Sequence, residues 1–210
     1  MTRSMGLLVA GFDYAAVDPG EFNDWYDTEH IPERRGTPGF INAERWLGVE
    51  DDRISIATYD LDSFAVLESP GYRAIAGENL SPWSKRIVGK CRRVCRFDGE
   101  QVNPGDRCAP DGAGALLLVA MNVEPAAEAE FAEWYDSEHL PRLAAMPGCL
   151  AARRFRGHAG THRYLALCHL AAPEVAGSKA WEAAAVTPWM VKLRPATSDR
   201  LRLVLRPYRR

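Results

Sequence analysis

Residues 25–32 read Trp-Tyr-Asp-Thr-Glu-His-Ile-Pro, and residues 134–141 read Trp-Tyr-Asp-Ser-Glu-His-Leu-Pro. The two octapeptides lie inside a longer repeat, because residues 21–48 and 130–157 align without a gap at an offset of 109 and share 13 of 28 residues. Pro82-Trp83 then matches Pro188-Trp189 at an offset of 106. We therefore expect two copies of one structural unit in the chain, the second slightly shortened.

The copies are separated by a segment with the composition of a linker. Residues 99–114 are rich in Gly, Pro and Asp and show no hydrophobic periodicity. We therefore predict a first unit over residues 1–98, a linker over 99–114 and a second unit over 115–210.

Each copy shows the same order of predicted elements. A short apolar run predicts a strand, and Asp18-Pro19-Gly20-Glu21 has the capping residue, proline and glutamate that mark a helix start. A hairpin, a second helix and a last strand follow. For the first copy we predict a strand over residues 5–12, a helix that starts at residue 18 and stops before Pro32, and further elements over 40–47, 53–61, 63–76 and 86–97. For the second copy we predict a strand at 115–122, a hairpin turn at 158–160, a helix at 173–186 and a last strand at 200–208.

This order is typical of an α+β fold, the ferredoxin-like or split βαβ pattern. An antiparallel sheet with both helices on one face leaves its other face uncovered. Two tandem units can cover each other, so we predict an intramolecular pseudo-dimeric α/β barrel, with a small-molecule pocket between two facing sheets.

Composition excludes several classes of protein. The chain has 26 basic and 28 acidic residues and a formal charge of −2, so it lacks the field of a nucleic-acid binder. No apolar run has the length of a membrane helix, and no signal-peptide cleavage site follows the N-terminus, so we expect a cytoplasmic protein. The five cysteines have no metal-site spacing and are interpreted as reduced thiols.

Basic residues gather only near the C-terminus. Alternation with apolar residues there favours the solvated face of a strand over a phosphate-binding strip. The residues concerned are Arg200, Arg202, Arg206, Arg209 and Arg210.

The repeated octapeptide supplies the candidate catalytic residues. Helical spacing puts Phe22, Trp25, Tyr26, Glu29 and His30 on one stripe. Asp27 lies three residues before His30, within reach of its ring on a regular helix, where a carboxylate would fix the tautomer and raise the pKa of the imidazole. One interpretation is that His30 or His139 exchanges a proton with a substrate and is oriented by Asp27 or Asp136. The other is that these side chains cap the helix end and fix the turn into Pro32, which we expect to stop the helix.

Further polar and aromatic residues have two interpretations each. Arg45 and Arg154 occupy equivalent strand positions and could anchor an anionic substrate, although pairing with Glu29 or Asp27 of the same copy is favoured. The aromatic residues could either bind substrate or pack in the core, and the sequence leaves both alternatives open for Tyr59, Tyr164, Trp83 and Trp189. His158, His162 and His169 occur only in the second copy, and the spacing of the last two makes them poor joint metal ligands.

Residues 25–32, followed by Pro38-Gly39-Phe40 and Arg45, resemble the EthD-like branch of the dimeric α/β-barrel superfamily, as does the twin segment up to Arg154. The resemblance covers nearly the whole chain except the linker. It implies a barrel of two ferredoxin-like units, which most members build from two chains. Members include cofactor-free monooxygenases, polyketide cyclases, lactone isomerases, and haem-dependent dehydratases and peroxidases, so the resemblance specifies the fold more closely than the reaction.

We therefore predict an acid–base enzyme of the cyclase, isomerase or lyase type, or a cofactor-free monooxygenase, acting on a small, largely apolar or aromatic molecule. No metal-ligand or haem-ligand motif is evident, so no cofactor is expected. A non-catalytic binding protein and a haem protein are the alternatives. The expected partner is the small-molecule substrate, without nucleic acid or membrane, and the fused chain could form a homodimer. Divergence between the copies, such as Phe40 against Cys149, leads us to expect one working pocket.

Overall fold

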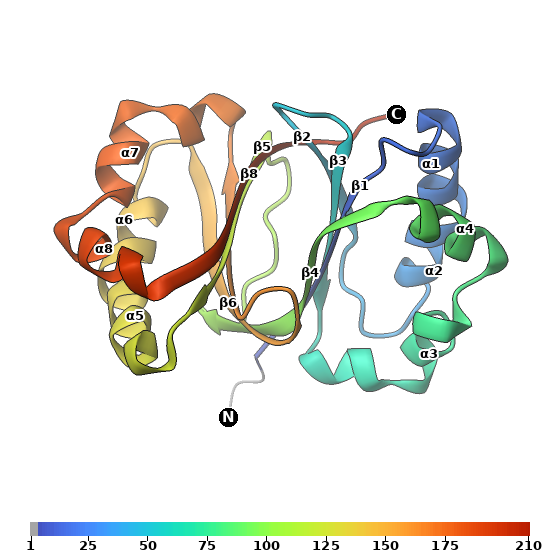
Figure 1. The fold of residues 1–210 in the computed structure, drawn as a ribbon, viewed down its shortest axis with the longest axis horizontal. Helices are drawn as coiled ribbons and strands as arrows, with labels where there is room; N and C mark the ends of the chain where they lie inside the picture. The colour runs from blue at the N-terminus through green and yellow to red at the C-terminus, as the bar shows by residue number, and fades with distance from the viewer. Residues whose placement is uncertain (1–3) are drawn as a thin grey trace.

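The computed structural model describes residues 4–210, and their eight antiparallel strands form one closed barrel (Figure 1). The order around the barrel is β1-β3-β2-β8-β5-β7-β6-β4, with β4 paired back to β1. Each copy of the repeat therefore contributes four consecutive strands in the same order, β4-β1-β3-β2 and β8-β5-β7-β6. The strands are β1 (Gly6–Asp13), β2 (Glu44–Gly48), β3 (Ile54–Leu61), β4 (Arg92–Asn103), β5 (Ala115–Val123), β6 (Cys149–Gly160), β7 (Tyr164–Leu170) and β8 (Thr197–Pro207).

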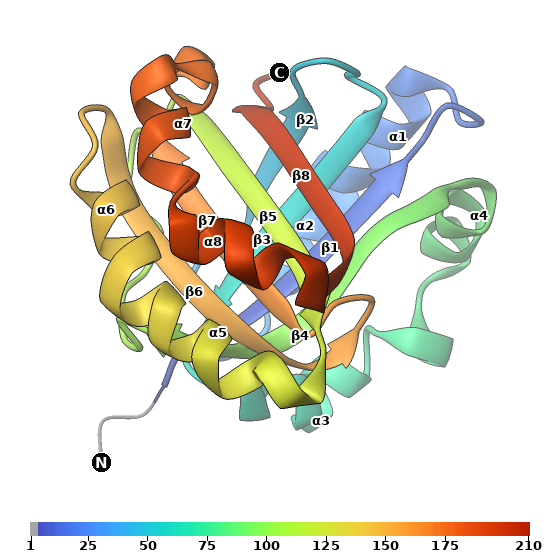
Figure 2. The ribbon, with the colours of Figure 1, turned by 60° about the vertical axis from the view of Figure 1, so that its left-hand side comes forward.

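The helices lie outside the barrel in two groups, one over each half, as Figures 1 and 2 show. The first group is α1 (Pro19–Trp25), α2 (Ile31–Arg35), α3 (Pro70–Arg73) and α4 (Pro82–Lys90), and the second is α5 (Glu128–Trp134), α6 (Leu140–Ala144), α7 (Lys179–Ala185) and α8 (Pro188–Leu193). A π-helical turn joins the first two helices of each group, η1 (Tyr26–His30) and η5 (Tyr135–His139). Short 3-10 turns are η2 (Phe64–Glu68), η3 (Gly77–Asn79), η4 (Pro125–Ala127), η6 (Pro173–Gly177) and η7 (Arg194–Ala196). Within residues 4–210, no helix combines the length and apolarity needed to cross a membrane.

The inside of the barrel is a packed hydrophobic core. Trp46, Phe97, Leu118, Phe155 and Leu205 meet there, each no more than 2% exposed. A barrel of eight strands is just wide enough for side chains to fill its interior. Our prediction of a small-molecule pocket between two facing sheets is therefore wrong, because side chains occupy that space.

Several predicted elements are confirmed and others are shifted. The Oδ1 atom of Asp18 accepts the Glu21 N–H at 3.0 Å, so the predicted helix start is correct. The first hairpin, β2 with β3, is also confirmed. In the second copy β6 continues through residues 158–160, the predicted turn, because its end pairs with β4 of the first half, Phe97 opposite Gly160.

The end of the first copy differs most from the prediction. Residues 86–90, predicted as strand, belong to α4, which begins at the N-cap Ser81 with Pro82 in its first turn. The predicted helix 63–76 is instead two short pieces, η2 and α3, broken where Pro70 begins the second. The strand β4 then runs to Asn103, so residues 99–103 of the predicted linker are strand.

One ion pair and one histidine–carboxylate contact cross the barrel interior between the halves. Arg153 on β6 binds Asp60 on β3 at 2.7 Å, with both side chains no more than 2% exposed. At the offset of 109, the residues equivalent to this pair are Glu44 and His169, whose Oε2 and Nε2 atoms lie 3.9 Å apart. The first copy thus has the acidic residue of each pair and the second copy has the basic one, so the two halves are complementary rather than identical.

The linker closes one end of the barrel over these pairs. The N–H of Ala109 donates to Asp60 at 2.6 Å, and Arg153 donates to the carbonyl of Arg107 at 3.0 Å. Gln101 binds the backbone of Arg107 through both its carbonyl and its amide group. The segment is therefore held by buried polar groups from both halves.

Candidate active site

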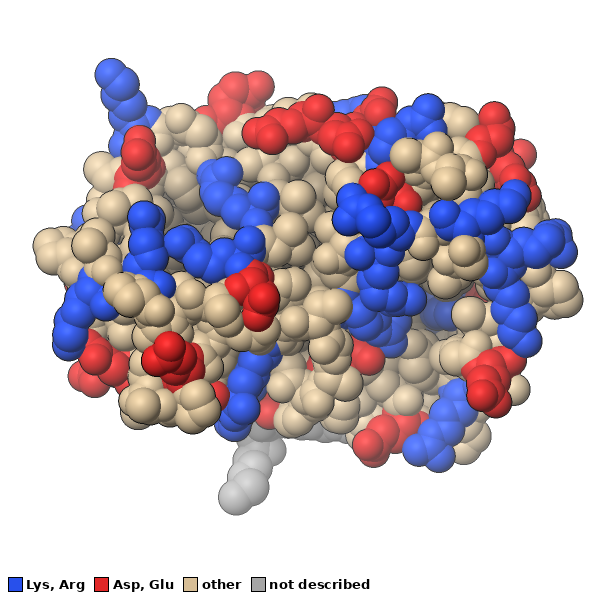
Figure 3. Space-filling view, in the orientation of Figure 1, with Lys and Arg blue, Asp and Glu red and all other residues tan. Residues whose placement is uncertain are grey.

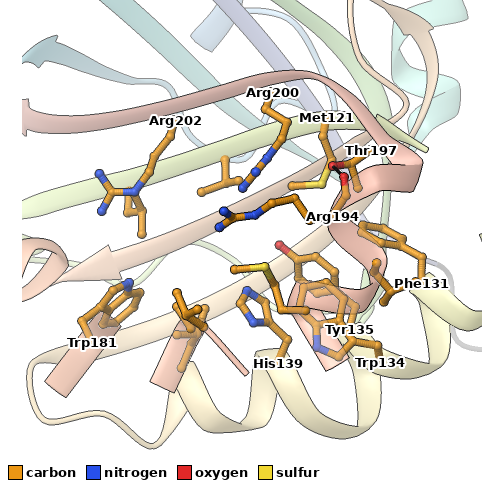
Figure 4. Close-up of a pocket in the computed structure, with 17 residues that line it drawn as sticks. Met121, Phe131, Trp134, Tyr135, His139, Trp181, Arg194, Thr197, Arg200 and Arg202 are labelled. Atoms are coloured by element: carbon orange, nitrogen blue, oxygen red, sulfur yellow. Dashed lines mark hydrogen bonds between the residues drawn. The ribbon is translucent and has the colours of Figure 1, made fainter. Parts of the chain in front are cut away.

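Two cavities lie between the outer face of the sheet and the helices that cover it, one in each half. The first-half cavity, about 310 Å³, is lined by His30, Arg34, Tyr59, Tyr72, Arg93 and Arg96, among others. The second-half cavity, about 220 Å³, is lined by apolar residues together with Trp134, Tyr135, His139, Trp181 and three arginines (Figure 4). Each cavity thus contains the histidine of the repeated octapeptide.

The π-helical turn brings this histidine to the cavity. The N–H of Ile31 donates to the carbonyl of Tyr26, five residues earlier, where a regular helix would use the fourth. In a regular helix the ring of Pro32 would collide with the carbonyl of Thr28, and we infer that the wider turn relieves this contact. The chain then continues as α2 with Ile31 in the helical region, so our prediction that Pro32 stops the helix is wrong.

Burial determines the charge of both histidines. The Nδ1 atoms of His30 and His139 are buried and have no hydrogen-bond partner within residues 4–210. Desolvation holds the pKa of His30 well below its ordinary value and lowers the pKa of His139 to about 4. The rings pack on Trp25 and Trp134, with centroids 4.6 and 4.4 Å apart. Both imidazoles are therefore uncharged at neutral pH.

The predicted pairing of each histidine with an aspartate is wrong. Asp27 instead accepts hydrogen bonds from Arg45 at 3.3 Å and Tyr208 at 3.1 Å, and Asp136 pairs with Arg154 at 2.9 Å. Because the π turn has more residues per turn than an α-helix, residues three apart on it no longer face one another. The predicted rise in the histidine pKa is consequently a fall.

Arg45 and Arg154 tie the first helix of each half to the barrel. The Arg45 guanidinium lies between the rings of Tyr26 and Tyr208, 4.1 and 3.9 Å from their centroids, and donates to Asn23 at 2.8 Å. The favoured interpretation, pairing with Asp27, is confirmed. Neither arginine lines the 310 Å³ or the 220 Å³ cavity, so the geometry does not support their predicted role as substrate anchors.

The glutamates of the octapeptide connect its helix to the next one. Glu29 accepts hydrogen bonds from Ser81 at 2.5 Å and Ser84 at 3.0 Å, and Ser81 is the N-cap of α4. Glu138 likewise accepts from Thr187, the N-cap of α8, at 2.5 Å. These residues hold each cavity's helical wall together.

The predicted aromatic binding residues divide between cavity and core. Tyr59 lines the first-half cavity, and its buried hydroxyl has no partner within residues 4–210. Tyr164 packs on Phe131 with centroids 5.0 Å apart, outside both cavities. Trp83 packs against the first-half core, and Trp189 donates to Glu130 at 2.8 Å. For these last three, the core-packing interpretation fits the structure.

The sequence analysis missed most residues of the second-half cavity. Trp181 lines one wall, and Arg194, Arg200 and Arg202 extend over the cavity from the β8 side, opposite His139 (Figure 4). We had interpreted Arg200 and Arg202 as part of a solvated face. Comparison of β4 with β8 at the offset of 106 could have revealed them, because Arg96 and Arg202 are equivalent but their neighbours differ.

No group of three or more potential metal ligands occurs within the described range 4–210. Two histidines found only in the second copy, His162 and His169, do not suit a haem ligand. Both ring nitrogens of His162 are engaged, by Thr161 at 2.7 Å and by the carbonyl of Asp199 at 2.9 Å. His169 lies in the barrel interior with no exposed surface. Neither ring offers a nitrogen to a cavity.

Comparison with solved structures shows the fold. An anthrone oxidase-like protein matches with a TM-score of 0.70 at 12% identity, covering 98% of this chain and 92% of that one. A candidate monooxygenase from Fusobacterium nucleatum matches with a TM-score of 0.65 at 9% identity, covering 100% and 94%. A variant of chlorite dismutase from Candidatus Nitrospira defluvii matches with a TM-score of 0.61 at 10% identity, covering 99% and 93%.

At such identities the likeness shows the fold alone. The chain shares with these neighbours a mixed α+β architecture around a closed eight-stranded antiparallel barrel. No protein-family model and no curated protein matches the sequence.

Proposed function

We propose that the protein is an enzyme that removes a proton from a small, largely apolar or aromatic carbon acid bound in the second-half cavity, with His139 as the base. The reaction class is isomerisation, cyclisation, elimination or cofactor-free oxygenation, each of which can begin with this step. The observation that carries the proposal is the imidazole of His139, which packs on Trp134 with its Nδ1 buried in the wall of a largely apolar cavity.

The chemistry follows from burial. An imidazole with a pKa of about 4 is unprotonated at neutral pH and can accept a proton. Because its Nδ1 is buried, we assign the proton transfer to Nε2. The imidazolium that forms would be stabilised by the enolate produced beside it, since opposite charges attract strongly in a medium of low dielectric constant.

Tyr135 is suited to bind the oxygen of that enolate. Its ring lies beside Trp134 on the cavity wall, with centroids 4.9 Å apart. Burial raises the pKa of its hydroxyl, which therefore stays protonated and can donate a hydrogen bond. A hydrogen-bond donor positioned where negative charge develops is a large source of catalysis.

Anthrone is a suitable probe, since it is a flat tricyclic carbon acid and one structural neighbour is named for its oxidation. The first step would move a proton from C10 of anthrone to His139 and leave the enolate. Reaction of the enolate with dissolved oxygen, with return of the proton from His139, then gives anthraquinone and water. Exchange of the C10 hydrogens in deuterium oxide without oxygen isolates the proton transfer, and oxygen uptake follows the second step.

His139→Gln should lower the enzyme-dependent exchange rate by about 10²- to 10⁴-fold, with the fold retained by circular dichroism. His30→Gln is the matched variant in the other copy and tests whether the first-half cavity also works. Exchange unaffected by either substitution would remove both histidines from the mechanism.

The alternative of a non-catalytic binding protein would be favoured by histidines fully engaged in backbone hydrogen bonds. The free Nδ1 atoms of His30 and His139 count against it. Anthrone that binds without any exchange of its C10 hydrogens would support it.

Several finer assignments belong with this proposal. The repeated octapeptide and equal strand order support two tandem ferredoxin-like units, at residues 1–98 and 115–210, of the EthD-like branch. A cytoplasmic location, the absence of a cofactor and a homodimer of the fused chain remain predictions. Absorption in the Soret region by purified protein would overturn the assignment of a cofactor-free enzyme.

A further inference from the structure

We propose that the ligand of the second-half cavity is an organic anion, a flat apolar or aromatic body carrying a carboxylate at the end nearest β8. This proposal rests on the proposed function for the location of the site and adds the chemical class of the molecule. It is carried by three arginines that lack acidic partners and by their comparison with the first half.

The arginines at the second-half cavity have no carboxylate to neutralise them. Arg194, Arg200 and Arg202 all line the cavity, and within residues 4–210 none lies within 4 Å of an Asp or Glu oxygen. Arg202 donates one hydrogen bond, to the carbonyl of Ala176 at 2.8 Å. Three unneutralised cations around one opening attract an anion, and guanidinium groups match the geometry of a carboxylate.

The equivalent arginine of the first half is neutralised by the chain itself. In the sheet Arg96 lies opposite Ala10, and Arg202 lies opposite Val119, the residue that matches Ala10 at the offset of 109. Arg96 binds Asp98 at 2.8 Å and the hydroxyl of Tyr72 at 3.0 Å.

Two residues beyond Arg202, in place of Asp98, the second copy has Val204. The internal carboxylate has been lost while the arginine has been kept. The geometry therefore leaves room at this position for an acid supplied by a ligand.

Of the other two arginines at the first-half cavity, one has a carboxylate partner and one does not. In the first half Arg34 pairs with Glu33 at 3.1 Å, and Arg93 lies over the ring of Phe12 at 5.2 Å. Val88 lines that cavity, whereas its equivalent at the offset of 106 is Arg194. Each cavity thus has three lining arginines, but in the first half two of them, Arg34 and Arg96, have a carboxylate partner, and in the second half none has.

The apolar walls indicate the rest of the ligand. Trp134 and Trp181 face the cavity together with Leu117, Met190 and Leu193. In the first half the Trp25 Nε1 donates to Ser84 at 2.9 Å.

At the position of Ser84 the second copy has Met190, and the Nε1 of Trp134 is buried without a partner within residues 4–210. A polar anchor of the helical wall has been exchanged for a flexible apolar side chain. Such a change suits an aromatic ligand.

The arrangement separates charge from apolar surface. Figure 4 shows the arginines on the β8 side and the aromatic rings on the helix side. Figure 3 shows basic side chains on both halves of this face, among them a group on the left, over the second half. A ligand would lie with its ring system against the tryptophans and its carboxylate toward β8.

The test compares 2-naphthoate with 2-naphthamide, which have the same ring system and differ in charge. Isothermal titration calorimetry on the full chain at low salt gives both dissociation constants. We expect the acid to bind at least about tenfold more tightly than the amide, which corresponds to about 1.4 kcal/mol. The preference should shrink as salt is raised, since the arginines are exposed to solvent.

Matched variants show which arginines cause the preference for the acid over the amide. Arg194→Gln, Arg200→Gln and Arg202→Gln combined should make acid and amide bind within about twofold of each other. Arg206→Gln removes one exposed arginine from β8 without touching the cavity, and should keep the preference. An amide that binds as tightly as the acid, a preference that survives the triple substitution, or no binding of the acid up to millimolar concentration would each overturn the proposal.

The two proposals can fail separately. Neither naphthalene probe has an acidic C–H, so the acid preference does not depend on proton transfer, and His139→Gln should retain it. Anthrone exchange that depends on His139 but no acid preference would leave the function standing and remove the ligand class. The reverse result would support an anion-binding protein without the proposed chemistry.

Discussion

The titration of His139 is the prediction that follows most directly from the structure. A pKa of about 4 against an ordinary value of 6.5 corresponds to about 3 kcal/mol of preference for the uncharged form, at about 1.36 kcal/mol per pKa unit. The cause is desolvation of a ring packed on Trp134 in an apolar wall. The unfolded chain binds the proton near pH 6.5, whereas the folded chain does so only near pH 4.

Stability should therefore depend on pH in this window. Above pH 6.5 the histidine is neutral in both states and contributes no pH dependence. As pH falls from 6.5 to 4, the unfolded state binds a proton at His139 that the folded state does not bind. The free energy of unfolding should therefore fall by up to about 3 kcal/mol over this range, and His139 should cause no further change below pH 4. Urea unfolding of the wild type and His139→Gln across this range should show curves that diverge by that amount.

Nuclear magnetic resonance of the imidazole provides the direct measurement, with His139→Gln to assign the signal. The expected midpoint is near pH 4 in the free protein. Asp136→Asn should leave it nearly unchanged, because that carboxylate pairs with Arg154. A midpoint at or above 6.5 that falls on removal of Asp136 would refute the burial argument and restore the Asp–His pairing expected from the sequence.

Two further predictions concern residues that stabilise the barrel interior and the helical wall of the first-half cavity. Arg153→Met should lower the unfolding free energy by about 3 to 5 kcal/mol, because it leaves Asp60 charged and buried without its partner. In urea unfolding, the double variant Arg153→Met with Asp60→Leu should recover much of this loss. Equal losses in the single and the double variant would contradict the prediction. Glu29→Gln should cost about 1 to 3 kcal/mol by weakening the hydrogen bonds from Ser81 and Ser84 to the first-half wall. Its effect on anthrone exchange should be within about twofold, and a loss as large as that of His139→Gln would place it in the chemistry.

Local signals in the sequence predicted local structure well. The Asp18 cap, the apolar strand runs and the first hairpin all depend on residues close in the chain, and each is confirmed. The closure of the barrel depends on β4 with β6 and β2 with β8, pairs between residues far apart in sequence. No local pattern encodes those pairs or the filling of the interior, so the barrel was predicted from the repeat but with a pocket inside it, where the structure has a packed core.

The site was predicted in part for a similar reason. The octapeptide correctly indicated a histidine near the buried side of its helix, but helical spacing placed Asp27 beside His30 because it assumed a regular helix. The π turn depends on Pro32 and on packing against the sheet. The arginines of β8 have no local signature, since only comparison with Asp98 in the other copy shows that Arg202 lacks an acidic partner.

A crystal structure with 2-naphthoate bound tests the central claim, that the working site is the helix–sheet cavity of the second half. We predict density for the naphthalene ring against Trp181 and near His139, with the carboxylate within hydrogen-bonding distance of Arg200 or Arg202. Density confined to the first-half cavity beside His30, or within the barrel interior, would contradict it.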